Sequence, residues 1–165
     1  NFTLNVLGTA SALPTTERYP SAQVLDVRGR LFMIDCGEGA QVALRRAKVS
    51  FLKIEHICLS HNHGDHIFGL FGLLSTMGML GRTAPLAIYA PASLSPTLEF
   101  FKTNFGEGLL YEIEHVVLID RIQFCRLLWS VFLYKLIKQV YVLAVDLSHY
   151  RHVFRALHAS FYLEG

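Results

Sequence analysis

The sequence has few cysteines and few charged residues. Of its 165 residues, 3 are cysteines and 17% are charged, whereas 52% are hydrophobic. An odd number of cysteines without a CxxC pair argues against a disulfide framework and favours a reducing compartment, so we expect the cytoplasm. A formal net charge of +2 does not by itself indicate a nucleic-acid-binding protein. The apolar content is instead that of a chain with a folded core.

The sequence also lacks an uninterrupted hydrophobic run long enough to cross a membrane. Its most apolar stretch, residues 122–147, is interrupted by Arg126, Lys135 and Lys138. A spanning helix needs about 20 consecutive, predominantly apolar residues. We interpret this stretch as protein core and expect no membrane association. No basic segment followed by an apolar run opens the sequence, so we expect no signal peptide.

The order of the predicted elements indicates an α/β fold. The length predicts a single domain over residues 1–165. Alternation of apolar and polar residues predicts strands over 2–8, 23–27, 31–35, 54–59, 86–89 and 111–118. Helices are predicted over 40–48, 67–80 and 95–105, the second of them buried on nearly every side. Residues 122–138 fit both patterns, and 140–145 are predicted to be extended. Intermixed strands and helices predict a sheet layered with helices.

Three histidines and an aspartate are crowded directly after a predicted buried strand. They are His61, His63, Asp65 and His66, all within the segment HNHGDH. Alternate residues of an extended segment point the same way, so His61 and His63 can bind one ion. A turn at Gly64 would direct Asp65 and His66 to a second ion. Imidazoles with one carboxylate suit Zn²⁺ best, with Mn²⁺ or iron as alternatives. The segment therefore predicts a dinuclear metal site.

A dinuclear site of this kind indicates hydrolytic chemistry. Two metal ions about 3.5–4 Å apart lower the pKa of a shared water and stabilise the attacking and leaving oxygens of a displacement at phosphorus. The isolated histidines are interpreted as structural, because a single histidine is usually a hydrogen-bonded core or surface residue; they are His56, His115, His152 and His158.

The segment HNHGDH resembles the HxHxDH signature of the metallo-β-lactamase superfamily. The neighbouring blocks LGTASALP (7–14), DCGEGAQ (35–41) and GDHIFGL (64–70) are similar to those of the ribonuclease Z family. Members of that family are endonucleases that remove the 3′ trailer of precursor tRNA. The resemblance covers roughly residues 1–120. It implies a metallo-β-lactamase-like αββα sandwich, of which this chain supplies mainly the N-terminal half, so we expect the domain to be incomplete at its C-terminus.

The resemblance also implies a role for each residue of the motif. His61 and His63 would bind the first metal, and Asp65 and His66 the second. Asp65 would in addition orient or deprotonate the attacking water. Asp35, in the block DCGEG, would support the metal-binding loop by accepting hydrogen bonds behind it, with a turn-capping role as the alternative.

Two further site residues follow from weaker matches. Arg18 matches the arginine of a family loop, PxKxRN, that lies by the tRNA 3′ end, although Thr16 and Tyr19 replace its lysine and asparagine. The segment DLSH, ending at His149, is the best match to the family block that carries the third histidine ligand of the first metal. His152 is a competing candidate for that role.

The expected cofactors are two Zn²⁺ ions per active site, with Mn²⁺ as the alternative, and the expected partners are precursor tRNA and a second copy of the chain. Two other functions stay open: a hydrolase of small esters, sulfates or phosphodiesters, and an inactive half that acts as a binding or dimerisation module. The family's bridging aspartate, last metal histidine and tRNA-clamping arm lie downstream of the matched blocks. The 165-residue chain alone is therefore expected to lack nuclease activity and to associate.

Overall fold

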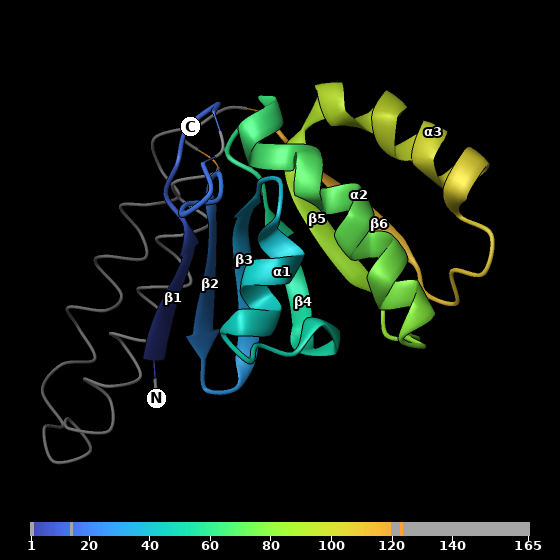
Figure 1. Cartoon of the computed structure of the whole chain (residues 1–165). Coiled ribbons are helices and arrows are strands. Elements are labelled where there is room, and N and C mark those ends of the chain that lie inside the picture. Colours follow the sequence, from blue (N-terminus) through green and yellow to red (C-terminus); the bar gives the residue numbers. More distant parts are fainter. Residues whose placement is uncertain (1, 14, 120–122, 124–165) are drawn as a thin grey trace, which may run out of the picture. The chain divides into compact units, whose positions relative to one another are not determined.

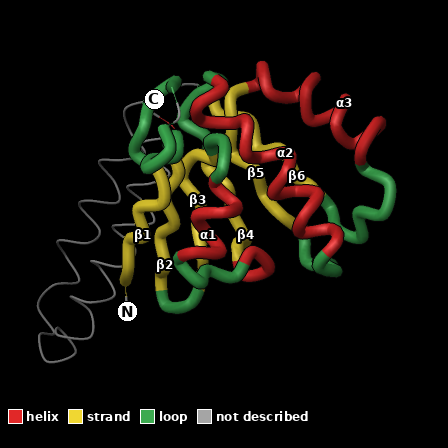
Figure 2. Tube along the Cα trace, viewed as in Figure 1, coloured by secondary structure: helices red, strands yellow, loops and turns green. Residues whose placement is uncertain are grey.

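The computed structural model describes residues 2–13, 15–119 and 123, which belong to one compact unit. Six strands form a single sheet in sequence order (Figures 1 and 2). The strands are β1 (Phe2–Gly8), β2 (Ala22–Val27), β3 (Arg30–Cys36), β4 (Ile54–Cys58), β5 (Leu86–Pro91) and β6 (Ile113–Leu118). The helices are α1 (Ala40–Arg46), α2 (Gly64–Met79) and α3 (Ser95–Phe105), with short 3-10 turns at Phe51–Lys53 and Ala92–Leu94.

The predicted α/β class is confirmed for these residues. The ambiguous segment 122–138, apart from residue 123, and the predicted strand 140–145 lie outside the described residues. The single domain over 1–165 stays a prediction. No helix among the described residues combines the length and apolarity needed to cross a membrane.

The sheet changes from antiparallel to parallel at β3. β1, β2 and β3 pair antiparallel, whereas β3, β4, β5 and β6 pair parallel. The carboxyl ends of β3 and β4 therefore lie at the same edge. In open α/β sheets, ligands bind in crevices outside the carboxyl ends of the strands. This topology places Asp35 beside the segment that follows β4.

Helices α1 and α2 lie together in front of one face of the sheet (Figure 1). Met33, Ile57 and Ile88 of the strands and Leu44 and Leu70 of these helices are fully buried in one cluster. Such a core is the main source of stability for a domain of this size.

Helix α2 differs from its prediction at its start and in its burial. It begins at Gly64, three residues earlier than its apolar pattern, so Gly64 opens a helix rather than a tight turn. Asp65 then falls in the first helical turn, where a carboxylate is favoured by the helix dipole. Phe68 and Met79 are 68% and 81% exposed. The helix buries one face, because it packs on the core from one side only.

The same helix makes a close backbone contact with the segment that follows Asp35. A Cβ atom at Gly69 would lie 2.0 Å from the carbonyl oxygen of Gly37. Any side chain at this position would force the two backbones apart. The small residues thus allow α2, which carries part of the histidine segment, to rest directly on the chain that leaves β3.

Gly69→Ala is therefore expected to destabilise the protein by about 1–3 kcal/mol, the usual cost of overpacking a tight contact. Gly72→Ala in the same helix is the matched control, because its Cβ would meet only the Gln41 side-chain amide, at 3.2 Å. There the higher helix propensity of alanine, worth about 0.5–1 kcal/mol, should leave stability equal or higher. Urea unfolding of both variants checks this difference. Equal midpoints would show that the Gly37 contact is unimportant.

A buried arginine lies at the edge of the sheet where β4 begins, opposite the carboxyl ends of β3 and β4. Arg82 is 3% exposed. Its guanidinium donates to the carbonyl oxygens of Ile54 at 2.8 Å, Ala84 at 2.7 Å and Pro85 at 2.7 Å. Burial lowers the pKa of Arg82, but these acceptors hold the charged form. The arginine fastens the loop before β5 to the beginning of β4.

Candidate metal centre

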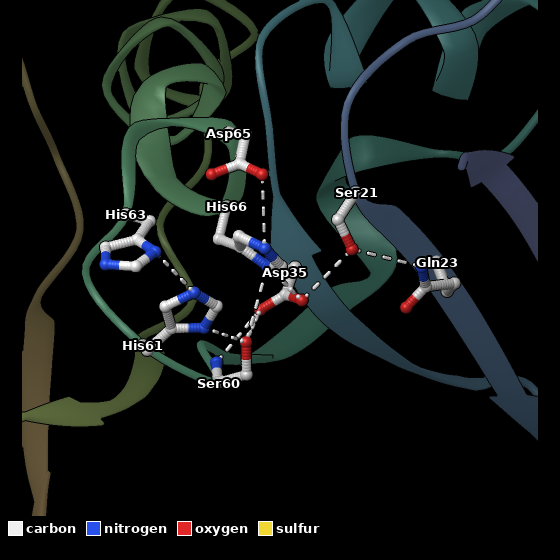
Figure 3. Close-up of polar contacts among 8 residues, drawn as sticks. All are labelled: Ser21, Gln23, Asp35, Ser60, His61, His63, Asp65 and His66. Atoms are coloured by element: carbon white, nitrogen blue, oxygen red, sulfur yellow. Dashed lines mark hydrogen bonds and ion pairs between the residues drawn. The ribbon is translucent and has the colours of Figure 1, made fainter. Parts of the chain in front are cut away.

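The structure brings His61, His63, Asp65 and His66 together with Asp35 near the carboxyl ends of β3 and β4 (Figure 3). His61 lies on the loop after β4, and His63 is the residue before α2. Asp65 and His66 belong to the first turn of that helix. The ring centroids of His61 and His63 are 4.5 Å apart, and those of His61 and His66 are 4.1 Å apart. The predicted cluster is therefore a real grouping of side chains in space.

Asp35 accepts four hydrogen bonds from three other segments. Its Oδ1 accepts from the backbone N–H of Ser60 at 2.9 Å and from the Ser60 hydroxyl at 2.8 Å. Its Oδ2 accepts from the Ser21 hydroxyl at 3.1 Å and from Nδ1 of His66 at 2.7 Å. The carboxylate is 7% exposed. Both lone pairs of each oxygen thus have a donor, as a buried carboxylate requires.

The backbone of Asp35 is in the left-handed region, with a φ of 55°. Aspartate and asparagine tolerate this conformation better than other non-glycine residues. The conformation comes one residue before the strand ends, where the carboxylate meets donors from outside its own strand. A turn-capping side chain bonds to the backbone of its own turn, whereas the Asp35 carboxylate bonds to three separate segments.

The atoms available to bind a metal form two facing pairs. Nε2 of His61 and Nδ1 of His63 are 3.0 Å apart. Two nitrogen ligands of one tetrahedral zinc ion would be separated by roughly 3.3 Å at Zn–N distances of about 2.0–2.1 Å. Nε2 of His66 lies 3.4 Å from Oδ2 of Asp65. The donor types and the pairing fit the two half-sites expected from the sequence.

Among the described residues, no group of three or more His, Cys, Asp or Glu side chains is arranged to hold a metal ion. The expected third ligand, His149, and its competitor His152 lie outside the described residues. The described part of the chain therefore presents two pairs of ligands and not a closed coordination shell.

Two cysteine thiols at the ends of these strands are not candidates for a nucleophile. Cys36 and Cys58 are free and buried. Burial raises the pKa of Cys58 to about 12 and raises that of Cys36 further, with the negative charge of Asp35 as a second cause in both cases. Both thiols are neutral at physiological pH, whereas the nucleophilic form is the thiolate.

A cavity of about 490 Å³ opens beside the cluster, in the size range of small-molecule sites. His63, directly before α2, and Asp65, in the first turn of α2, line this cavity. The other lining residues are Ala12, Pro20, Glu38, Asn62, Gly64 and Phe68. Asp65 is 14% exposed and can therefore reach a molecule in this space.

Arg18 is exposed and takes no part in the described contacts around Asp35. It lies in a turn whose Thr15 hydroxyl accepts from the backbone N–H of Arg18 at 2.9 Å. The next residue is anchored, because the Tyr19 ring packs against Gly39 and under the Arg46 guanidinium, 5.5 Å from the ring centre. The loop that carries Arg18 is thus held against α1, and Pro20 of the same loop lines the cavity.

Sequence reasoning did not identify Ser60 and Ser21 as hydrogen-bond partners of Asp35. Both hydroxyls bond to Asp35, and the Ser60 hydroxyl also lies 2.9 Å from Nδ1 of His61. A serine directly before the first histidine of the motif was the available signal for Ser60. Nothing in the sequence distinguished Ser21, which precedes β2 and reaches Asp35 through sheet pairing.

Comparisons with known proteins identify a family and several similar proteins. The sequence model of the family described as Anti-Pycsar protein Apyc1 matches residues 2–155. Ribonuclease Z of Bacteroides thetaiotaomicron is 55% identical over 118 residues, covering 68% of this chain and 37% of that protein. Ribonuclease Z of Parabacteroides distasonis is 49% identical over 113 residues, with the same shares. The chain spans little more than a third of the length of these relatives.

Solved structures show the same fold. Human tRNase Z, short form, has a TM-score of 0.64 and 33% identity, covering 69% of this chain and 44% of that one. A metallo-beta-lactamase fold protein from Bacillus subtilis has a TM-score of 0.54 and 22% identity, covering 68% and 44%. Both likenesses are consistent with the N-terminal half of that fold. The chain therefore belongs to the family described as Anti-Pycsar protein Apyc1, has the metallo-β-lactamase fold and is similar to ribonuclease Z over two thirds of its length.

Proposed function

We propose that the protein is a metal-dependent endoribonuclease that removes the 3′ trailer from precursor tRNA. The observation that carries this proposal is the grouping of two ligand pairs, His61 with His63 and Asp65 with His66, around the buried Asp35. The identity of 55% to a ribonuclease Z supports the choice of substrate. We also place the protein in the cytoplasm, in line with the free thiols of Cys36 and Cys58.

In this proposal, His61 and His63 hold a first metal ion and Asp65 and His66 a second. Zn²⁺ is the preferred metal, with Mn²⁺ as the alternative, because the donors are imidazole nitrogens and one carboxylate. His149 is the proposed further ligand of the first ion. When bound, such a pair supplies Lewis acidity toward phosphate oxygens and lowers the pKa of water.

The protein's own groups would position the substrate and move the proton. Asp65 lines the cavity and is partly exposed, so its carboxylate can accept a proton from a water placed there. Asp35 cannot do so, because all four of its lone-pair positions are taken by donors. Asp35 orients His66 instead. Arg18, on the anchored loop beside the cavity, is proposed to contact the phosphates near the 3′ end of the tRNA.

A second candidate function is hydrolysis of a small phosphodiester. The family whose model spans residues 2–155 is described by a name other than ribonuclease Z. The cavity of about 490 Å³ is also large enough for a small molecule. Both functions use the same ligand pairs, so only the substrate separates them.

The deciding experiment compares two substrates of the full-length protein. With added Zn²⁺ or Mn²⁺, a precursor tRNA with a 3′ trailer should yield a tRNA with a 3′-hydroxyl and a trailer with a 5′-phosphate. Bis(p-nitrophenyl) phosphate should be hydrolysed far more slowly per enzyme. The opposite ranking would favour the second candidate. A 2′,3′-cyclic phosphate on the tRNA would contradict attack by water, because that product requires attack by the ribose 2′-hydroxyl.

We further propose that the protein acts as a homodimer and that residues 1–165 alone are inactive. Exposed apolar side chains of α2 and α3, including Phe68, Phe100 and Phe105, support a protein contact. The short span relative to the ribonucleases Z supports the lack of activity. Sedimentation and trailer-cleavage assays on residues 1–165 test both statements: a monomer that cleaves precursor tRNA at the rate of the full-length protein would overturn them.

A further inference from the structure

The hydroxyl of Ser60 lies between Asp35 and His61. It is 2.8 Å from Oδ1 of Asp35 and 2.9 Å from Nδ1 of His61. A hydroxyl has one hydrogen to donate and two lone pairs that accept. The direction of its single donation therefore decides which nitrogen of His61 carries a proton.

The contact with the Asp35 carboxylate determines the direction of this donation. Oδ1 of Asp35 has no hydrogen, so a contact of 2.8 Å with the Ser60 oxygen is favourable only if Ser60 donates to it. Toward His61, the Ser60 hydroxyl must then act as the acceptor, which requires a hydrogen on Nδ1 of that ring. In the neutral ring, Nε2 of His61 then carries no hydrogen and presents its lone pair. This is the nitrogen that faces His63, 3.0 Å away.

His66 is held in the same tautomer by a direct contact with Asp35, without a hydroxyl between them. Its Nδ1 lies 2.7 Å from Oδ2 of Asp35 and must donate to it, so in the neutral ring Nε2, which faces Asp65, carries no hydrogen. One buried carboxylate thus acts on two histidines, on His66 directly and on His61 through a hydroxyl. In the proposed function these two histidines belong to different metal ions.

We propose that Ser60 is a positioning residue: it relays the charge of Asp35 to His61, holds that ring as the Nδ1–H tautomer and thereby presents Nε2 to the metal. The statement about the tautomer depends only on the contacts of Ser60. The statement about metal binding rests on the proposed function. The two can therefore fail separately.

The tautomer is tested by ¹⁵N NMR of histidine-labelled, metal-free full-length protein. We expect His61 of the wild type to be protonated on Nδ1. In Ser60→Ala the acceptor is lost, and His61 should become a mixture of both tautomers, while His66 keeps its direct bond to Asp35. Ser60→Thr retains a hydroxyl and should restore the wild-type spectrum. A wild-type His61 protonated on Nε2 would overturn the proposal even if no variant folds.

Ser21→Ala is the matched control, because Ser21 also donates to Asp35 but does not contact a histidine in the described structure. It should leave the His61 tautomer unchanged. A change equal to that of Ser60→Ala would mean that loss of any donor to Asp35 is sufficient, and the relay would be refuted.

Metal affinity is the second measurement. Competition with a zinc chelator should show Zn²⁺ binding weakened by about 10- to 100-fold in Ser60→Ala, the usual effect of losing a hydrogen bond behind a metal ligand, and nearly unchanged in Ser21→Ala. Equal affinities of wild type and Ser60→Ala would refute the role toward the metal. If the tautomers respond as expected but neither protein binds metal, the proposed function fails and the role of Ser60 in fixing the ring stands.

Discussion

Asp65→Ala in the full-length protein is expected to lower the rate of trailer cleavage by about two to four orders of magnitude, the range over which a positioned general base contributes. The substitution removes one proposed metal ligand and the carboxylate that faces the cavity. The affinity for precursor tRNA should change little, because it depends mainly on phosphate contacts elsewhere. Single-turnover cleavage and filter binding of the same precursor separate the two quantities.

Two controls test whether the loss of cleavage is due to the Asp65 carboxylate itself. Asp65 also lies in the first turn of α2, where its charge is worth about 0.3–1 kcal/mol of helix stability, so the variant must be folded at the assay temperature. Glu38→Ala removes another carboxylate that lines the same cavity but takes no part in the contacts of Figure 3. We expect a change within a few-fold for Glu38→Ala. Similar losses in both variants would argue against a distinct role for Asp65.

Asp35→Asn is expected to have the other large effect. Asparagine tolerates the left-handed backbone at this position, so the substitution changes the side chain and not the turn. One carboxylate oxygen becomes an amide that donates, and in either orientation it faces two donors. We expect metal affinity to fall by about 10- to 100-fold or more. We also expect the free energy of unfolding to fall by about 1–3 kcal/mol, the usual cost of an unsatisfied buried polar group. Chelator competition and urea unfolding measure these effects.

Asp26→Asn is the matched control, because Asp26 has fewer hydrogen-bond donors around it than Asp35. Asp26 accepts one hydrogen bond, from the backbone N–H of Gly29 at 2.7 Å, and the amide oxygen of asparagine can keep it. Both measured quantities should stay close to the wild type. If Asp35→Asn behaves like Asp26→Asn, the four donors around Asp35 are not important for the site.

The parts of the fold with strong local patterns could be predicted from the sequence. Helix α3 has the predicted bounds, and the strands agree to within one or two residues. The start of α2 could not be placed, because Gly64, Asp65 and His66 carry no apolar periodicity and become helical through the contact of α2 with the turn after β3. The burial of Arg82 was equally hidden, since its acceptors are backbone carbonyls that sheet assembly brings together.

The site shows the same division between local and long-range information. HNHGDH is contiguous, so its residue types and spacing were sufficient to predict a cluster. The role of Asp35 came from resemblance, and that of Ser60 was not predicted. A hydroxyl becomes informative only when both of its neighbours are known. His61 is the next residue in the sequence, but Asp35 reaches Ser60 only through the parallel pairing of β3 with β4.

This pairing has a consequence for the order of events during synthesis. The bond between Asp35 and His66 spans 31 residues, and those between Asp35 and Ser60 span 25. They form only after β3 and β4 have come together, and such long-range parallel pairing is among the slower steps of folding. A cation captured by the nascent chain before that step would meet three mobile imidazoles without their oriented tautomers. If the proposed function holds, the metal ion that the folded protein binds would depend on timing as well as on affinity, because the features that select a geometry are assembled late.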